Sequence, residues 1–138
     1  MINKHFYEYD DVLNRINEVQ SKIIEIREKI YSVKGIRYDE MPSGSTLPTD
    51  ITYYLIELEE LEHELEELKN KRMELRKNHE LEIDKLDNTK HRSVLRMHYL
   101  MKLDIYKIAD TLNLSVSHIR KIKKEASDEF MRLNDNKW

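Results

Sequence analysis

Cysteine is absent from the 138-residue chain. This absence excludes disulfide bonds, thiolate metal sites and cysteine nucleophiles, and it fits a reducing compartment. Glycine and proline are also scarce, with two residues of each. Because these two residue types mark turns, we expect few turns and long helices rather than the many loops of a compact enzyme.

Long apolar runs are missing as well. No stretch approaches the ~20 apolar residues that a membrane-spanning helix requires. The first residues, Met1-Ile2-Asn3-Lys4-His5, do not begin the apolar region of a signal peptide. We therefore expect a cytoplasmic protein with no membrane partner.

Charge is divided unevenly along the chain. Residues 1–88 hold 13 Lys/Arg against 21 Asp/Glu, a balance of −8, whereas residues 89–138 hold 11 against 6, a balance of +5. The overall value of −3 hides this division. A basic C-terminal part joined to an acidic N-terminal part indicates that only the C-terminal part binds a polyanion.

The N-terminal part carries an apolar seam with alternating steps of three and four residues. Its members are Tyr9, Val12, Ile16, Val19, Ile23, Ile26, Ile30 and Val33. Such heptad spacing over more than three repeats is typical of a coiled coil. The pattern predicts a helix over about residues 4–33.

A second long helix is predicted over residues 51–86, after a loop at 34–50 that holds both glycines and both prolines. Its seam consists of Tyr54, Leu58, Leu61, Leu65, Leu68 and Leu75, with Arg72 interrupting it. Neither helix can bury its apolar stripe alone, so an antiparallel hairpin, a dimer or both must cover it. We therefore interpret residues 1–86 as a coiled-coil oligomerisation arm.

The C-terminal part, residues 87–138, is predicted to form three shorter helices. Val94, Met97, His98 and Met101 mark an amphipathic helix over about 89–101. Helices over 105–112 and 116–133 follow, with Asp104 able to cap the first of them. The expected fold is all-α, with a helical hairpin followed by a three-helix, helix-turn-helix unit.

The last two helices meet the main requirements of a helix-turn-helix. Two helices that cross closely need a small contact residue, which Ala109 supplies. Asn113 tolerates the positive φ that the turn often needs. Ser115 can cap the last helix and leave its N-terminus facing phosphate. The small core is expected to contain Ile108, Leu112, Leu114, Ile119 and Ile122.

The last helix separates its apolar and basic residues onto two faces. On a helical wheel with Ile119 at the centre of the apolar face, Ser117, Lys121 and Lys124 lie opposite, flanked by His118 and Arg120. Arginine suits bidentate contacts to guanine, and lysine suits phosphate. The predicted DNA-binding residues are Ser115, Ser117, His118, Arg120, Lys121 and Lys124.

Three segments carry a resemblance to a known family: Arg92-Ser93-Val94-Leu95-Arg96-Met97-His98-Tyr99, Tyr106-Lys107-Ile108-Ala109 and Leu114-Ser115-Val116-Ser117-His118-Ile119-Arg120-Lys121-Ile122. Together they resemble region 4 of sigma-70 factors, over about residues 87–133. The whole layout is similar to small phage and prophage transcriptional regulators of late operons. The resemblance implies a DNA-binding regulator in a bacterial host cell, with RNA polymerase as a further partner.

Two departures limit what the resemblance implies. Asn113 replaces the common glycine, and the sigma regions that bind core polymerase and melt the promoter are absent. The resemblance therefore implies a sigma-like accessory regulator rather than a complete sigma factor. Its DNA-contacting positions fall on Ser117, His118, Arg120, Lys121 and Lys124.

Other chemistry finds little support in the sequence. Glu60 and His63 have the Glu-x-x-His spacing of di-iron bundles, but no second copy follows and the run is better explained as a solvated face. Glycine-rich phosphate loops and catalytic triad patterns do not occur. We expect no enzyme activity, no cofactor and no metal site.

Two alternative functions stay open from sequence. A phage DNA-packaging protein similar to a terminase small subunit also joins a helix-turn-helix to a coiled coil, although it usually places the DNA reader first. A coiled-coil adaptor would bind protein instead of DNA. The leading hypothesis is a homodimer or higher homo-oligomer that presents its recognition helices to double-stranded DNA.

Overall fold

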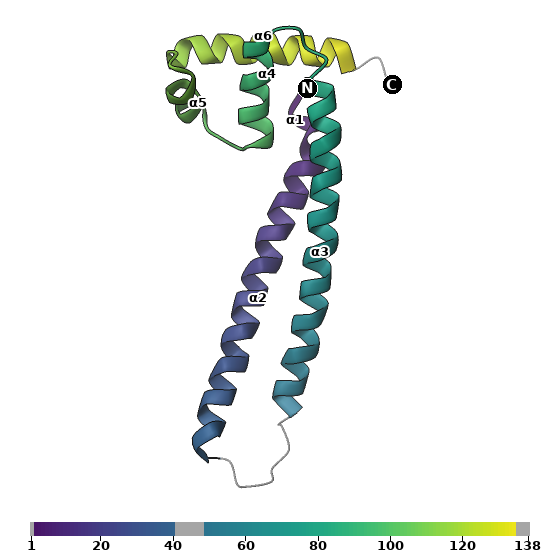
Figure 1. The fold of residues 1–138 in the computed structure, drawn as a ribbon, viewed down its shortest axis with the longest axis vertical. Helices are drawn as coiled ribbons and strands as arrows, with labels where there is room; N and C mark the ends of the chain where they lie inside the picture. Colours follow the sequence, from purple (N-terminus) through teal and green to yellow (C-terminus); the bar gives the residue numbers. More distant parts are fainter. Residues whose placement is uncertain (1, 41–48, 135–138) are drawn as a thin grey trace. The chain divides into compact units, whose positions relative to one another are not determined.

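The computed structural model describes residues 2–40 and 49–134, and its regular elements there are all helices (Figure 1). The predicted all-α fold is confirmed. Within the same residues, no helix is long and apolar enough to cross a membrane. In chain order the elements are α1 (Ile2–His5), α2 (Tyr7–Glu40), α3 (Thr49–Ile83), α4 (Thr89–Leu95), the π-helix η1 (Arg96–Leu100), α5 (Ile105–Leu112) and α6 (Val116–Asn134).

These elements form two compact units. Residues 10–72 make up the arm unit, and residues 1–9 together with 73–138 make up the C-terminal unit. The division differs from the sequence-based boundary at residue 86, because the first residues and the end of α3 belong with the C-terminal helices. Each unit is described below by itself.

In the arm unit, α2 and α3 form an antiparallel hairpin (Figure 1). The α2 seam is buried as predicted, at Val12, Ile16, Val19, Ile23, Ile26 and Ile30. Two ion pairs join the helices across the seam: Arg15 Nη2 to Glu64 Oε1 at 2.6 Å, and Arg27 Nη2 to Glu62 Oε1 at 3.0 Å. Both pairs are exposed, so they contribute little to the free energy of unfolding. Their main effect is to favour one register of the two helices.

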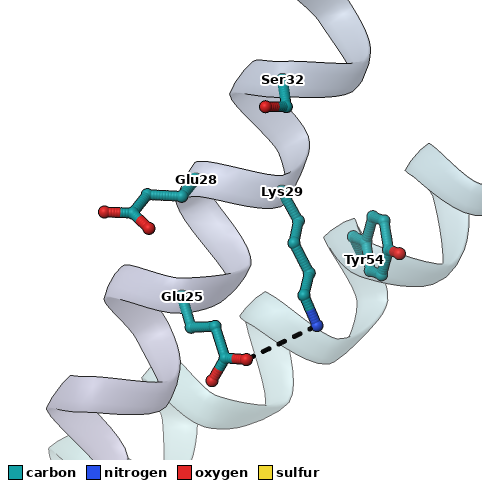
Figure 2. A pocket seen from close by; sticks show the side chains of 5 residues that line it. All are labelled: Glu25, Glu28, Lys29, Ser32 and Tyr54. Carbon is teal, nitrogen blue, oxygen red and sulfur yellow. Dashed lines mark ion pairs between the residues drawn. The ribbon is translucent and has the colours of Figure 1, made fainter.

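Nearer the loop end of the arm, a lysine bridges the two helices. Figure 2 shows Lys29 of α2 extending between Glu25 and the ring of Tyr54 on α3. Its Nζ lies 3.7 Å from Glu25 Oε1 and 5.8 Å from the centre of the Tyr54 ring. Glu28 and Ser32 complete the lining of a surface hollow of about 330 Å³. Its one lysine is already paired with Glu25 and lies over the Tyr54 ring.

The seam of α3 is covered less well than that of α2. Leu58, Leu61, Leu65 and Leu68 are all only half-buried. In the first turns of α3, Tyr53, Leu55 and Ile56 are exposed. The helix α2 therefore buries its apolar seam, whereas α3 leaves much of its apolar surface exposed.

Three predicted helix boundaries were wrong. Residues 34–40, predicted as loop, continue α2, because one internal Gly35 costs only ~1 kcal/mol in a long helix. The rest of the predicted loop, residues 41–48, lies outside the described residues. The first helix is interrupted at Phe6, between α1 and α2. At its other end α3 stops at Ile83 rather than 86, where turn bonds such as Leu86 N–H to Ile83 O replace the helical ones.

The C-terminal unit has a dense aromatic core. Phe6 stacks on Tyr99 with ring centres 4.7 Å apart, and Phe130 of α6 lies 5.6 Å from Phe6. Phe6 and Phe130 are fully buried. The hydroxyl of Tyr9 donates to the carbonyl oxygen of Leu100 at 3.2 Å, which satisfies its polar end inside the core. These contacts hold the first nine residues against η1 and α6.

The predicted helix over 89–101 is α-helical only to Leu95. Its second half is the π-helix η1, closed by a bond from the Met101 N–H to Arg96 O at 3.0 Å. The wider turn rotates the buried face, so Tyr99 and Leu100 are buried whereas Met101, predicted to face the core, is 49% exposed. The turn that follows places Lys102 at a positive φ of 59°.

Candidate nucleic-acid interface

The helix-turn-helix consists of α5, a short turn and α6. Asn113 ends α5 in the left-handed conformation, with φ 56° and ψ 42°. The Leu114 N–H then donates to Ala109 O at 3.0 Å, and Ala109 is buried where the two helices meet. The roles predicted for Asn113 and Ala109 are therefore confirmed, since a larger residue at 109 would push the helices apart.

Both helices of the motif begin with a capping side chain. Asp104 Oδ1 accepts from the Lys107 N–H at 2.8 Å, and Ser115 Oγ accepts from the His118 N–H at 3.1 Å. Each bond satisfies one of the free N–H groups at a helix start. The predicted cap at Ser115 is confirmed, and other N–H groups of the first turn of α6 keep the positive end of the helix dipole at the surface.

A small apolar core fixes the angle of α6. Its buried members are Val94, Ile108, Ala109, Ile119 and Ile122. Leu112 and Leu114, also predicted for this core, pack against it while partly buried. Because Ile119 and Ile122 lie on the inner face of α6, the opposite face points outward.

The outer face of α6 carries the residues predicted to contact DNA. Ser117, His118, Arg120, Lys121 and Lys124 are all exposed, and so is Ser115 at the start of the helix. These side chains are thus available to a ligand. Exposure is the condition that the predicted site requires.

One family comparison covers most of these elements. A profile described as a protein of unknown function, DUF1492, matches residues 44–131. The chain belongs to the DUF1492 family. The DUF1492 match spans α3, α4, η1 and α5 and reaches into α6, so the second helix of the arm and most of the helix-turn-helix fall within one family match. No curated protein and no solved structure matches the chain.

In this DUF1492 protein, a basic hollow lies beside the predicted reading face. Arg120, Lys123, Lys124 and Ser127 line it from α6, opposite Ile2, Asn3 and Tyr99, with Ile105 completing it. Its volume is about 410 Å³ and its lining holds three cationic side chains but no acid. A hollow of this charge suits an anion such as a backbone phosphate.

Sequence reasoning missed Lys123 as a member of this surface. Its Nζ lies 6.0 Å from the centre of the Tyr99 ring, and the Tyr99 hydroxyl donates to Asn3 Oδ1 at 3.2 Å. On the helical wheel Lys123 sits beside the apolar face, where a lysine is easily assigned to packing. Only the folded position of the first residues shows that it borders a basic hollow.

Two of the three acids of α6, Glu125 and Glu129, lie on the side of the helix that faces His91. Glu129 Oε2 is 3.2 Å from His91 Nδ1, and Glu125 Oε2 is 3.6 Å from His91 Nε2. The His91 side chain is only 14% exposed because these contacts cover it. The contacts direct the carboxylates of Glu125 and Glu129 toward α4, whereas Asp128 lies on the outer face, one turn beyond Lys124.

Proposed function

We propose that this DUF1492 protein is a sequence-specific, DNA-binding transcriptional regulator of phage or prophage genes. It reads the major groove with α6 and oligomerises through the arm unit. The single observation that carries the proposal is the exposed basic face of α6, presented directly after the left-handed turn at Asn113. That combination of turn geometry and charge is what a recognition helix requires.

Different side chains of α6 serve different parts of the recognition. Arg120 supplies the bidentate contacts that discriminate between bases, and Ser117 allows a close approach to the base edges. Lys121, Lys124 and Lys123 neutralise phosphates and thereby supply affinity that depends on salt. His118 and the Ser115 cap lie at the N-terminus of α6, where a phosphate of the DNA backbone would bind.

The half-buried leucines of α3 support the oligomeric part of the proposal. A stripe at heptad spacing that one partner helix covers incompletely is stabilised further by a second copy. Two copies would place two recognition helices on neighbouring half-sites. RNA polymerase is the proposed further partner, through the part of the chain that resembles sigma region 4.

The test measures fluorescence anisotropy with duplex fragments at two salt concentrations, including the region upstream of the protein's own gene. We expect one fragment to bind well above a salt-sensitive background. Arg120→Ala with Lys121→Ala should weaken specific binding by at least tenfold, since one bidentate contact contributes ~1–3 kcal/mol. The matched control is Lys71→Ala with Arg72→Ala, which removes the same two charges from the arm.

Other outcomes of this test separate the alternatives. Equal affinity of the wild type and the Arg120/Lys121 variant for every fragment would reject the assignment of the reading face. Equal, weak binding to all fragments together with a ring of more than four subunits would favour the packaging function. Absence of any salt-dependent binding would favour a protein adaptor.

A further inference from the structure

A cluster of two histidines and one glutamate lies in the C-terminal unit, apart from α6's basic face. His5 comes from α1, whereas His79 and Glu82 stand one turn apart near the end of α3. His5 Nε2 is 2.7 Å from Glu82 Oε2, and His79 Nδ1 is 2.8 Å from Glu82 Oε1. The donor atoms of all three side chains lie within 4.8 Å of one another.

Apolar rings enclose much of this cluster. The centre of the His79 ring is 4.5 Å from that of Phe6 and 6.0 Å from that of Tyr9, and the His5 ring is 5.1 Å from Phe130. His79 is 7% exposed. The Glu82 side chain keeps 13% of its surface exposed, so the cluster is closed toward the core and open on one edge. Interactions of a cation are stronger in such surroundings than in water.

The carboxylate of this cluster stays ionised. Burial acts to raise the pKa of Glu82, but the hydrogen bonds that its two oxygens accept from His5 and His79 outweigh burial and lower that pKa. The pair of imidazoles thus faces a negative charge inside a mostly apolar shell. A negative charge there favours a cation between the rings.

One nitrogen of the cluster lacks a partner. Glu82 accepts from both histidines only if His79 carries its hydrogen on Nδ1, and a neutral imidazole then has a bare lone pair on Nε2. His79 Nε2 is fully buried and has no hydrogen-bond partner among the described residues. Burying such a lone pair costs free energy. The opposite tautomer puts an N–H at Nε2, which neighbouring aromatic rings accept weakly, and frees Nδ1 to bind a cation.

We propose that His5, His79 and Glu82 form a binding site for a first-row divalent cation, with Zn²⁺ as the best fit. Two imidazole nitrogens with one carboxylate oxygen are ligands that Zn²⁺ accepts, whereas Ca²⁺ and Mg²⁺ prefer oxygen alone. Ligand atoms ~2.0–2.2 Å from a tetrahedral ion lie ~3.3–3.6 Å apart, so the donor atoms, now within 4.8 Å of one another, would have to move together by up to about 1.5 Å. The Glu82 carboxylate would turn so that the ion replaces its two hydrogen bonds.

The ion would act as a structural clip rather than in DNA reading. It would join α1 to the end of α3. The two histidines that it links, His5 and His79, are 74 residues apart in the sequence. The exposed edge of the cluster leaves the fourth coordination position to water. Each histidine keeps one hydrogen by moving it to the nitrogen that does not bind the ion, so coordination needs no oxidant and no other reactant.

The test uses the full chain, without a histidine tag, after dialysis against a chelator. Calorimetric titration with ZnCl₂ should show one ion per chain. At ~100 times the Kd, Zn²⁺ should raise the thermal midpoint by roughly 5–10 °C. His5→Gln should weaken binding at least tenfold and abolish that rise, and Glu82→Gln should do the same.

The arm unit offers a matched control. His63 Nε2 lies 3.1 Å from Glu67 Oε1, but these side chains are 76% and 69% exposed, and within residues 2–40 and 49–134 no third ligand joins them. His63→Gln should therefore leave Zn²⁺ binding unchanged. His5→Gln tests the site without emptying the core, because its side chain is 18% exposed and stands near the start of the chain.

Three results would overturn the proposal. These are no Zn²⁺ binding by the wild type, undiminished binding by folded His5→Gln, or equal loss in His63→Gln. The first result would leave the cluster as a hydrogen-bonded His–Glu–His network without a metal. None of these readouts involves DNA, so failure of the metal site and failure of the proposed regulatory function are separate results.

Discussion

The two units of this protein bury apolar surface to different extents. In the C-terminal unit, Phe6, Ile108, Ile119 and Phe130 are fully buried, although α5 and α6 are much shorter than the helices of the arm. In the arm unit the helices are long, yet the leucines of α3 are only half-buried. Long helices gain their stability from packing of an apolar face, so the arm is the unit that gains most from a second copy.

This contrast assigns different physical tasks to the two units. The C-terminal unit completes its own core within one chain, which gives α6 a fixed orientation whatever the concentration. The arm leaves Tyr53, Leu55 and Ile56 exposed, so its stability should depend on association and therefore on concentration. Three experiments test this difference between the two units.

The largest effect is expected from the core of the C-terminal unit. Phe130→Ala removes a fully buried ring that contacts His5 and Phe6, and should destabilise the unit by ~3–5 kcal/mol. The control Tyr31→Ala truncates an aromatic side chain that is 80% exposed in the arm, and should change stability by less than ~0.5 kcal/mol. Urea unfolding measures both. Similar losses in the two variants would mean that the units do not differ as described.

A second experiment addresses the half-buried stripe of the arm. Leu61→Glu with Leu65→Glu places two charges on the surface that we expect a second copy to cover. The mass in solution, measured by light scattering, should fall to that of a monomer, while the C-terminal unit stays folded. Burial of an unpaired charge disfavours such an interface by several kcal/mol.

The control for the arm adds the same charges elsewhere on α3. Asn70→Glu with Asn78→Glu changes two exposed, uncharged positions and should leave the mass unchanged. The arm does not mediate oligomerisation if the wild type is monomeric at all concentrations. The same conclusion follows if the Leu61/Leu65 variant keeps the wild-type mass.

Local features of the fold were predictable from sequence. The α2 seam follows from the spacing of Val12, Ile16 and Val19, and the helix-turn-helix follows from Ala109, Asn113 and Ser115. Each of these features depends on residues within a few turns of one another, where periodicity and capping act directly. The end of α2 was predicted too early because Gly35 was read as a helix terminator. A single glycine lowers helix stability only slightly, and α2 continues to Glu40.

Features that depend on distant residues were not predictable. The cluster of His5, His79 and Glu82 exists only because the fold brings α1 to the end of α3. The same is true of Lys123, which borders a basic hollow only once Asn3 and Tyr99 are in place. The π-helix at Arg96–Leu100 leaves no signal in the spacing of apolar residues, so Met101 was expected on the buried face.

The smallest effect is expected at the turn of the helix-turn-helix. Asn113 holds φ 56°, and alanine at that position lacks the short polar side chain that makes the left-handed region tolerable. Asn113→Ala should therefore cost ~1 kcal/mol in urea unfolding, whereas Asn113→Gly should keep or slightly raise stability. If alanine and glycine behaved alike, the turn would not need a left-handed residue, and the orientation of α6 would have to come from the Ile108, Ile119 and Ile122 core alone.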